Sequence, residues 1–177
     1  AENQGLLLAH GVHNLDRMRW LTDDEPALVS AHCATFREDA PAELSSMSLF
    51  RFRRGAMGSF WCEWECPKPA FPRSGSSAWI MGEEGVLDLD AYGQLRLGRG
   101  GEWEVVAEQA PIDWRGKGML DPVRMEAYRL QNQEFVDSIR EGRAPAVDGA
   151  EGRAAVEMAL AAYQSSETGQ SVAFPLR

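Results

Sequence analysis

Residues 77–108 read SAWIMGEEGVLDLDAYGQLRLGRGGEWEVVAE and contain four strand-length segments in close succession. The segments hold β-branched or aromatic residues in partial alternation, and turn formers separate them: Glu84-Gly85, Tyr92-Gly93 and Gly98 to Gly101. No helix-length segment intervenes, so consecutive strands must be joined by hairpins. This stretch therefore predicts an antiparallel sheet.

The strand pattern extends towards the N-terminus, and helical periodicity begins on both sides of it. Three more strand-length segments, ALVSAHCATFR, LSSMSLFRF and GSFWCEWEC, lie within residues 27–66. Helical patterns cover residues 6–21, 122–142 and 148–169, and a last short strand, SVAFPL, follows them. Asp23, Asp24 and Pro26 stop the first helix, Asp121 and Asp148 are expected to begin the other two, and Gly142 and Gly169 to end them. This order predicts an α+β fold, a large mostly antiparallel β-sheet with helices packed on one face. We expect residues 1–177 to form a single domain.

Composition is that of an ordinary soluble globular domain, and it excludes several functions. The 177 residues include 18 Lys+Arg and 27 Asp+Glu, which gives a formal charge of −9 and a pI near 4.9. Nucleic acids and anionic membranes select basic faces, so neither is an expected partner. No apolar run approaches the roughly 20 residues of a membrane span, and the first residues lack the basic region of a signal peptide. Three cysteines do not make a disulfide framework, so we expect a cytoplasmic protein.

Signatures of metal or cofactor binding are weak. Cys62 and Cys66 lie on one predicted strand, where their spacing separates them by about 13 Å, too far to share a zinc ion. His10 and His13 are one helical turn apart, but no third ligand is evident in the sequence. The chain has no G-x-G-x-x-G motif, and its glycine-dense residues 98–101 lie between strands, whereas a phosphate loop precedes a helix. We expect neither a metal nor a dinucleotide site in this chain.

His13 and Asp16 are the most suggestive pair of polar residues. They lie one helical turn apart on the polar side of the first predicted helix. The opposite side of the helical wheel holds Leu8, Val12, Leu15 and Met18. A neutral imidazole is suited to general acid–base catalysis near neutral pH, but the same spacing also fits a surface histidine beside a surface carboxylate. Spacing alone leaves both interpretations open.

Longer stretches of the chain match one protein family in order. They are GLLLAHGVHNLDRMRWLTDDEP, RRGAMGSFWCEWE, AWIMGEEGVLDLD and, most specifically, DGAEGRAAVEMALAAYQSSETG with the strand after it. This succession resembles the C-terminal domain of the Gfo/Idh/MocA oxidoreductases, which include glucose–fructose oxidoreductase and inositol dehydrogenase. The resemblance covers essentially all 177 residues.

The resemblance implies part of an enzyme whose N-terminal Rossmann domain is not in this sequence. In the family that domain binds NAD or NADP and carries a catalytic lysine, while the C-terminal domain supplies the substrate pocket and mediates oligomerisation. The family's helix histidine falls on His13 and the aspartate after it on Asp16. The implied reaction is hydride transfer between nicotinamide and a hydroxyl-bearing carbon of a sugar, polyol or similar metabolite. The isolated chain is expected to be inactive.

One position departs from the family pattern. The family's aspartate, four residues before the histidine, falls on Ala9, whose methyl group can neither orient an imidazole nor bind a hydroxyl. His10 lies about 60° further round the wheel and is a poor substitute. The departure supports a second hypothesis, a catalytically silent sugar-binding or scaffold protein of the same fold.

Aromatic residues on the predicted strands suggest two further roles. Trp61 and Trp64 are candidate substrate-binding residues because indoles stack on sugar C–H faces, although ordinary core or interface packing is the simpler explanation.

Met47 and Leu49 lie on the opposite side of their strand from Phe50 and Phe52, so both sheet faces include large apolar side chains. An uncovered apolar face predicts a homodimer or homotetramer through the open sheet. The alternative is that the loops 67–75 and 109–121 cover that face.

Overall fold

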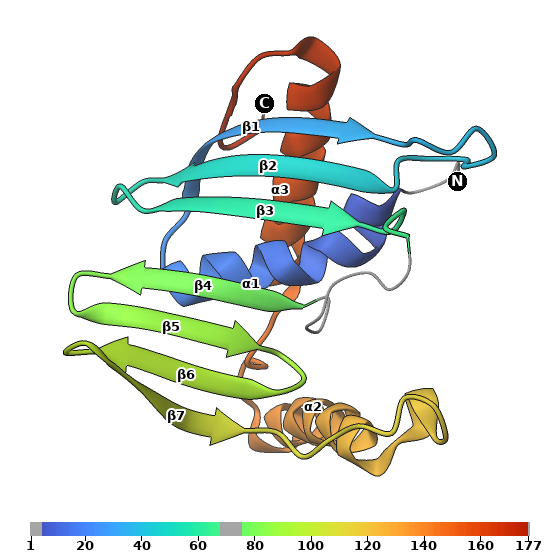
Figure 1. The fold of residues 1–177 in the computed structure, drawn as a ribbon. Helices are drawn as coiled ribbons and strands as arrows, with labels where there is room; N and C mark the ends of the chain where they lie inside the picture. Colours follow the sequence, from blue (N-terminus) through green and yellow to red (C-terminus); the bar gives the residue numbers. More distant parts are fainter. Residues whose placement is uncertain (1–4, 68–75, 177) are drawn as a thin grey trace. The chain divides into compact units, whose positions relative to one another are not determined.

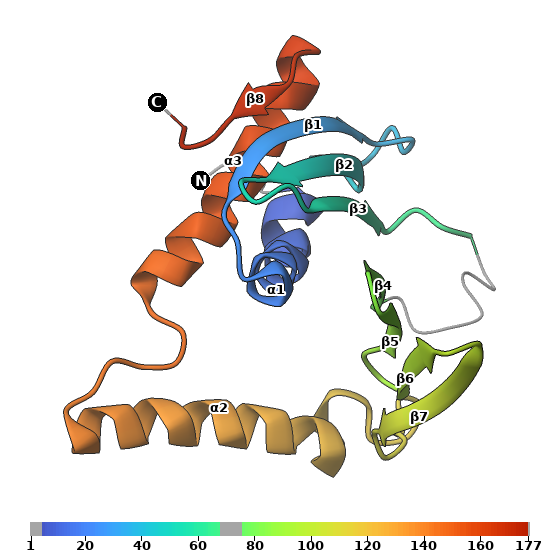
Figure 2. The same ribbon diagram turned by 90° about the vertical axis from the view of Figure 1, so that its left-hand side faces the viewer.

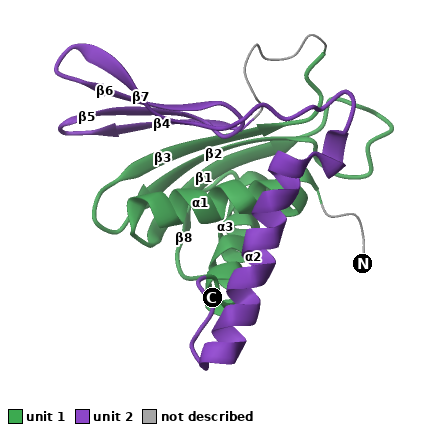
Figure 3. Cartoon of the chain, turned by 90° about the horizontal axis from the view of Figure 1, so that it is seen from below, with its two compact units in different colours: residues 1–67, 147–177 green, residues 68–146 purple. Residues whose placement is uncertain are grey.

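The computed structural model describes residues 5–67 and 76–176, and the chain divides into two compact units (Figure 3). Unit 1 consists of Ala1–Pro67 and Val147–Arg177, so both ends of the chain contribute to it. Unit 2 consists of Lys68–Ala146. Each unit contains an antiparallel sheet and helix, which confirms the predicted α+β class.

Unit 1 has a four-stranded sheet in the order β3-β2-β1-β8, with helices on one face (Figures 1 and 2). Its strands are β1 (Pro26–Ala34), β2 (Ser45–Phe52), β3 (Met57–Glu63) and β8 (Val172–Ala173). Its helices are α1 (Val12–Thr22), which continues the π-helical turn η1 (Leu7–Gly11), and α3 (Gly149–Thr168). All neighbouring strands are antiparallel, and β8 returns from the C-terminal segment to pair with β1.

The core of unit 1 lies between this sheet and its two helices. Phe50 and Phe52 of β2 are buried, whereas Met47 and Leu49 point to the other face and are exposed. This alternation confirms the predicted separation of the two pairs and follows from the two-residue period of a strand. Burial of one such phenylalanine contributes roughly 1.5–3 kcal/mol to folding.

Helix α3 packs closely on β1 because its inward face is made of small residues. The side chain of Asp148 caps its first turn by accepting backbone N–H bonds, and Gly169 ends it with φ 67°. The alanines of its inner face are buried: Ala155, Ala159, Ala161 and Ala162. This close approach lets the Ser165 hydroxyl accept a hydrogen bond of 3.0 Å from the backbone N–H of Ala31.

Unit 2 has a second four-stranded sheet, made entirely of consecutive hairpins. Its strands, in spatial order, are β4 (Ser77–Gly82), β5 (Gly85–Asp90), β6 (Gln94–Arg99) and β7 (Glu102–Glu108). The turn η2 (Gly118–Leu120) leads into helix α2 (Pro122–Glu141). Asp121 caps α2 by accepting the Val123 N–H at 2.9 Å, and Gly142 ends the helix, as the sequence predicts.

A buried ion pair lies on one face of the unit 2 sheet. Asp88 of β5 is fully buried and accepts a hydrogen bond from Arg96, its neighbour on β6. The Arg96 guanidinium lies 5.6 Å from the ring centre of Trp103, and that ring meets Trp79 edge-on at 6.2 Å. The aliphatic stem and aromatic neighbours of Arg96 therefore shield the Asp88 carboxylate from water.

The predicted strands and helices all appear, but the strands form two sheets in place of one large sheet. No β3–β4 ladder joins the two sheets in the described part of the chain. Residues 64–76 separate these strands, a connection far longer than the roughly two to five residues of a tight hairpin, so neighbouring positions in the chain do not force β3 and β4 to pair. Helices α1 and α3 cover the sheet of unit 1, whereas α2 belongs to unit 2. Residues 68–75 of the loop considered as a sheet cover lie outside the described residues.

Candidate functional site

Helix α1 carries His13 and Asp16 on the side away from the core. On the core side, Leu15 is fully buried and Met18 packs over Gly58 of β3, where an added Cβ would come within 2.6 Å of the methionine sulfur. His13 is exposed and Asp16 is half-buried. Side chains three residues apart are neighbours on a helix surface, so an imidazole and a carboxylate lie together on this face.

The turn η1, directly before His13, is wider than an α-helical turn. Leu7 and Leu15 are both fully buried although they lie eight positions apart. At about 100° per residue these two side chains would differ by about 80° in a regular helix, and the extra residue of a π-turn brings them to one side. The wheel prediction therefore missed Leu7, while Leu8 and Val12 are only half-buried at the edge of the core.

His10 and Trp64 form an aromatic contact that the sequence did not reveal. Their ring centres are 4.7 Å apart and the rings are nearly perpendicular, at 74°. Trp64 follows β3 directly, so this contact places its indole on the helix-bearing side of the sheet, near the start of α1. Ala9 is exposed there and offers only a methyl group.

Trp61 lies on the other face of the sheet. It pairs across the ladder with Met47, and both side chains are exposed, as is Leu49. Because Phe60 faces the helices near Gly11, its neighbour Trp61 must point away from them. The structure therefore brings Trp64 towards the helix that carries His13 but places Trp61 among the apolar side chains of the open face.

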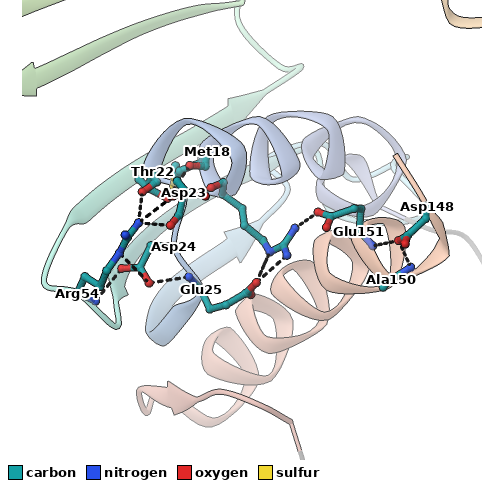
Figure 4. Close-up of polar contacts among 10 residues, drawn as sticks. Met18, Thr22, Asp23, Asp24, Glu25, Arg54, Asp148, Ala150 and Glu151 are labelled. Atoms are coloured by element: carbon teal, nitrogen blue, oxygen red, sulfur yellow. Dashed lines mark hydrogen bonds and ion pairs between the residues drawn. The ribbon is translucent and has the colours of Figure 1, made fainter. Parts of the chain in front are cut away.

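An ion-pair cluster fixes the C-terminal end of α1 (Figure 4). The Arg19 guanidinium donates two bonds of 3.0 and 2.6 Å to Glu25 Oε1 and a third to Glu151 of α3. These bonds raise the pKa of Arg19, and the bond from Arg19 holds the pKa of Glu25 below its usual range. The cluster therefore joins α1, the residue before β1 and the first turn of α3 through charge-assisted hydrogen bonds.

A second polar cluster ends α1 at the predicted stop. Asp24 accepts the backbone N–H of Arg54 at 2.7 Å and that of Glu25 at 2.8 Å. The Arg54 guanidinium donates to the Thr22 carbonyl at 3.0 Å, as Figure 4 shows. Asp23, with φ 45°, takes the left-handed conformation that terminates the helix.

Two of the three cysteines lie in surroundings that disfavour the reactive thiolate form. Burial, with the nearby charge of Glu43, raises the pKa of both Cys33 and Cys62 to about 11, so their thiols stay protonated near neutral pH. Cys66 lies beyond the end of β3. Among residues 5–67 and 76–176, no group of three or more His, Cys, Asp or Glu side chains could hold a metal ion.

Nicotinamide cofactors do not fit the glycine-dense segment of this chain. Gly100 and Gly101, with φ of 62° and 88°, make the hairpin turn between β6 and β7, and a strand follows them. A diphosphate-binding loop needs a helix N-terminus at that point.

Comparison with known proteins identifies the family. The family model described as "Oxidoreductase family, C-terminal alpha/beta domain", of the Gfo/Idh/MocA group, matches residues 1–174. The chain therefore belongs to this oxidoreductase family. No curated protein matches the sequence.

Solved structures share the fold at low sequence identity. An oxidoreductase from Agrobacterium radiobacter, in complex with NAD+, L-tartaric acid and magnesium, is 19% identical with a TM-score of 0.79, and the match covers 93% of this chain and 47% of that one. The WlbA dehydrogenase from Bordetella pertussis, in complex with NADH and UDP-GlcNAcA, is 23% identical with a TM-score of 0.72 over 99% and 46%. Aldose-aldose oxidoreductase from Caulobacter crescentus, complexed with glycerol, is 20% identical with a TM-score of 0.69 over 93% and 46%. The chain thus spans about half the length of these relatives.

Helices of the described residues are also unsuited to crossing a membrane, because none combines sufficient length with sufficient apolar character.

Proposed function

We propose that this chain is the substrate-binding domain of an NAD- or NADP-dependent oxidoreductase that acts on a sugar, polyol or related hydroxyl-bearing metabolite. The observation that carries the proposal is the family match over residues 1–174. The solvent-facing position of His13 on α1 supports it, because a residue that transfers a proton to substrate must be accessible.

His13 is assigned the proton-transfer step. Its neutral imidazole accepts the proton of the substrate hydroxyl as the adjacent carbon is oxidised, and the imidazolium returns that proton in the reverse reaction. Asp16, on the same face of α1, is assigned to bind a substrate hydroxyl. Trp64, held by His10, offers an indole surface for the C–H face of a sugar ring.

Trp61 remains a weaker candidate for substrate binding within one subunit, because it lies on the opposite sheet face from α1.

In this proposal the substrate carbon exchanges its hydride with a nicotinamide cofactor, which binds outside the described residues of this chain. A Rossmann domain elsewhere in the full-length protein would supply that site. The isolated 177-residue chain should therefore bind no NADH in a fluorescence titration at micromolar concentration.

The decisive experiment compares two histidine variants of the full-length protein. His13→Ala should lower kcat by about 10²–10⁴-fold, the usual contribution of general acid–base catalysis. His32→Ala is the control for loss of another exposed histidine. Because His32 pairs with Met47 on the open sheet face, sedimentation of both variants is compared first, so that a change of assembly is not taken for a change of catalysis. Steady-state kinetics with a panel of sugars and polyols measures both. If His13→Ala turns over substrate as fast as the wild type and His32→Ala, His13 is an ordinary surface residue.

A catalytically silent sugar-binding protein is the second candidate, and Ala9 is the observation that favours it. Under this hypothesis the full-length protein binds a sugar or polyol in calorimetry without any change in nicotinamide absorbance. Turnover of any substrate in the panel would exclude it.

We further propose that two copies associate through the open face of the unit 1 sheet, as a homodimer or as part of a homotetramer. Met47, Leu49 and Trp61 form an exposed apolar group there, with 60%, 63% and 50% of their surface accessible. Sedimentation at micromolar concentration tests this proposal, and Leu49→Lys should shift the chain to a 19.6 kDa monomer. A wild-type monomer would contradict it.

A further inference from the structure

Two residues distant in sequence hold the start of the helix that carries His13. The first backbone N–H groups of a helix have no partner within it and must be satisfied from outside. Here the Leu6 N–H donates to the Glu43 carbonyl at 3.0 Å and the Leu7 N–H to Glu43 Oε1 at 2.8 Å. The Leu8 N–H donates to the Tyr163 hydroxyl at 3.2 Å.

Glu43 and Tyr163 are themselves joined. The Tyr163 hydroxyl donates to Glu43 Oε1 at 2.7 Å, so the same carboxylate oxygen accepts from a helix N–H and from a side chain of α3. Burial, together with this bond to Glu43, raises the pKa of Tyr163, so its hydroxyl keeps its proton and remains a donor. A carboxylate at a helix N-terminus is also favoured by the helix dipole.

The chain fits tightly around the anchor, the pair of Glu43 and Tyr163 that binds the start of the helix. An added Cβ at Gly5 would lie 1.2 Å from Glu43 Oε2, so only glycine permits the carboxylate at this position. At Gly11, the last residue of η1, an added Cβ would lie 2.7 Å from Leu7 Cδ1 and 3.2 Å from the Phe60 ring. The segment that leads into the wide turn and the last residue of the turn are therefore both restricted by close contacts within unit 1.

The wide turn determines the direction of His13. Because it accommodates one extra residue, it rotates α1 by about 100° relative to a regular helix that starts from the same anchored leucines. With the turn in place, Leu7 and Leu15 both face the core and His13 faces solvent. Without the wide turn, the leucines bound to Glu43 and Tyr163 and the core-facing side of α1 could not both keep their present positions.

We propose that Glu43 and Tyr163 are positioning residues for His13: by binding the first N–H groups of the helix they hold the wide turn that orients the imidazole. The effect on catalysis rests on the proposed function of His13, whereas the effect on the turn does not.

The test uses three variants at the anchor and one control. Glu43→Ala removes the carboxylate, Tyr163→Phe removes only the hydroxyl, and Glu43→Gln retains an acceptor oxygen for Leu7. Glu157→Ala is the control, because Glu157 also accepts a backbone N–H, that of Leu176 at 2.6 Å, on a segment distant in sequence from η1.

Amide hydrogen exchange in the 177-residue chain measures the turn directly. We expect the Leu7 and Leu8 amides to exchange at least about tenfold faster in Glu43→Ala and in Tyr163→Phe, with little change in Glu43→Gln and Glu157→Ala. Unchanged exchange in Tyr163→Phe, the mildest variant, would overturn the inference even if Glu43→Ala failed to fold.

Kinetics of the full-length protein measure positioning. Glu43→Ala and Tyr163→Phe should lower kcat about 10–100-fold with KM within about twofold, since a small misplacement of a catalytic group costs rate rather than affinity. Glu43→Gln should restore kcat, and the pH profile should keep its shape because Glu43 transfers no proton to substrate. Normal kcat in the anchor variants beside an impaired His13→Ala would overturn this inference alone, whereas a normal His13→Ala would overturn the proposed function.

Discussion

The two units of this chain build the same kind of sheet but bury different kinds of side chain. Within the described residues, every buried apolar side chain belongs to unit 1, including Phe52, Leu15 and Met158. In unit 2 the buried residues are polar: Asp88, Asp121 and Ser138. Large apolar side chains of α2, such as Phe135 and Ile139, are exposed.

This difference shows that a segment can form a sheet without burying apolar side chains against it. Unit 2 gains its strands from tight hairpins, caps and ladder hydrogen bonds, which are local in sequence. Unit 1 gains its stability from contacts between residues far apart in sequence, such as those of β1 with α3. Substitutions should therefore have unequal effects in the two units.

The largest expected difference concerns phenylalanine. Phe52→Ala should destabilise the chain by about 3–5 kcal/mol, because it leaves a cavity at a position that is 1% exposed. Phe135→Ala, at a position that is 56% exposed, should cost less than about 1 kcal/mol. Urea unfolding followed by circular dichroism compares them, and similar losses would show that unit 2 has a core of its own.

Arginine gives a smaller difference. Arg19→Ala in unit 1 should cost about 1–3 kcal/mol, since it leaves Glu25 and Glu151 without their shared partner. Arg99→Ala in unit 2 removes a surface pair with Glu84 and should change stability by less than about 0.5 kcal/mol. The same unfolding experiment applies, and an equal effect of the two substitutions would contradict the expected importance of the unit 1 cluster.

The smallest expected effect is a pH dependence. The pKa of Glu25 is lowered in the folded chain by its bond from Arg19, so its stabilising contribution is present above its ordinary value near 4.5. That contribution should disappear as pH falls from about 5 through the lowered folded value.

Glu25→Gln should therefore lose less stability than the wild type over this range in thermal melts from pH 6 to pH 3. Parallel curves for the two proteins would show that Glu25 does not contribute to the acid sensitivity of unit 1.

Much of the fold was predictable because its signals are local. Alternation and turn residues predicted the strands, and Asp121, Asp148, Gly142 and Gly169 predicted the ends of α2 and α3. The division into two sheets was not predictable from periodicity, which describes single strands and says nothing about the pairing of β3 with β4. The wide turn was also missed, because a separation of about 80° between Leu7 and Leu15 still fits the apolar side of a regular helix and so gives no signal in the sequence.

The candidate site was predictable only in part. His13 and Asp16 follow from helical spacing and the family resemblance, and their position on the outer side of α1 agrees with the wheel. The contacts of Glu43 with Tyr163 and of His10 with Trp64 depend on tertiary packing. No residue spacing along the chain indicates them.

The assembly of unit 1 from both ends of the chain has a consequence for synthesis on the ribosome. Strands β1 to β3 emerge long before α3 and β8, with all of unit 2 translated in between. Until then α1 is the only one of the two covering helices that has been translated, and the part of the apolar sheet face that packs against α3 stays open. Unit 2, made of neighbouring hairpins, needs nothing that comes later. The unit that holds the apolar core is therefore the last to be completed. Until its C-terminal segments are translated, a chaperone or a neighbouring nascent chain has access to that core.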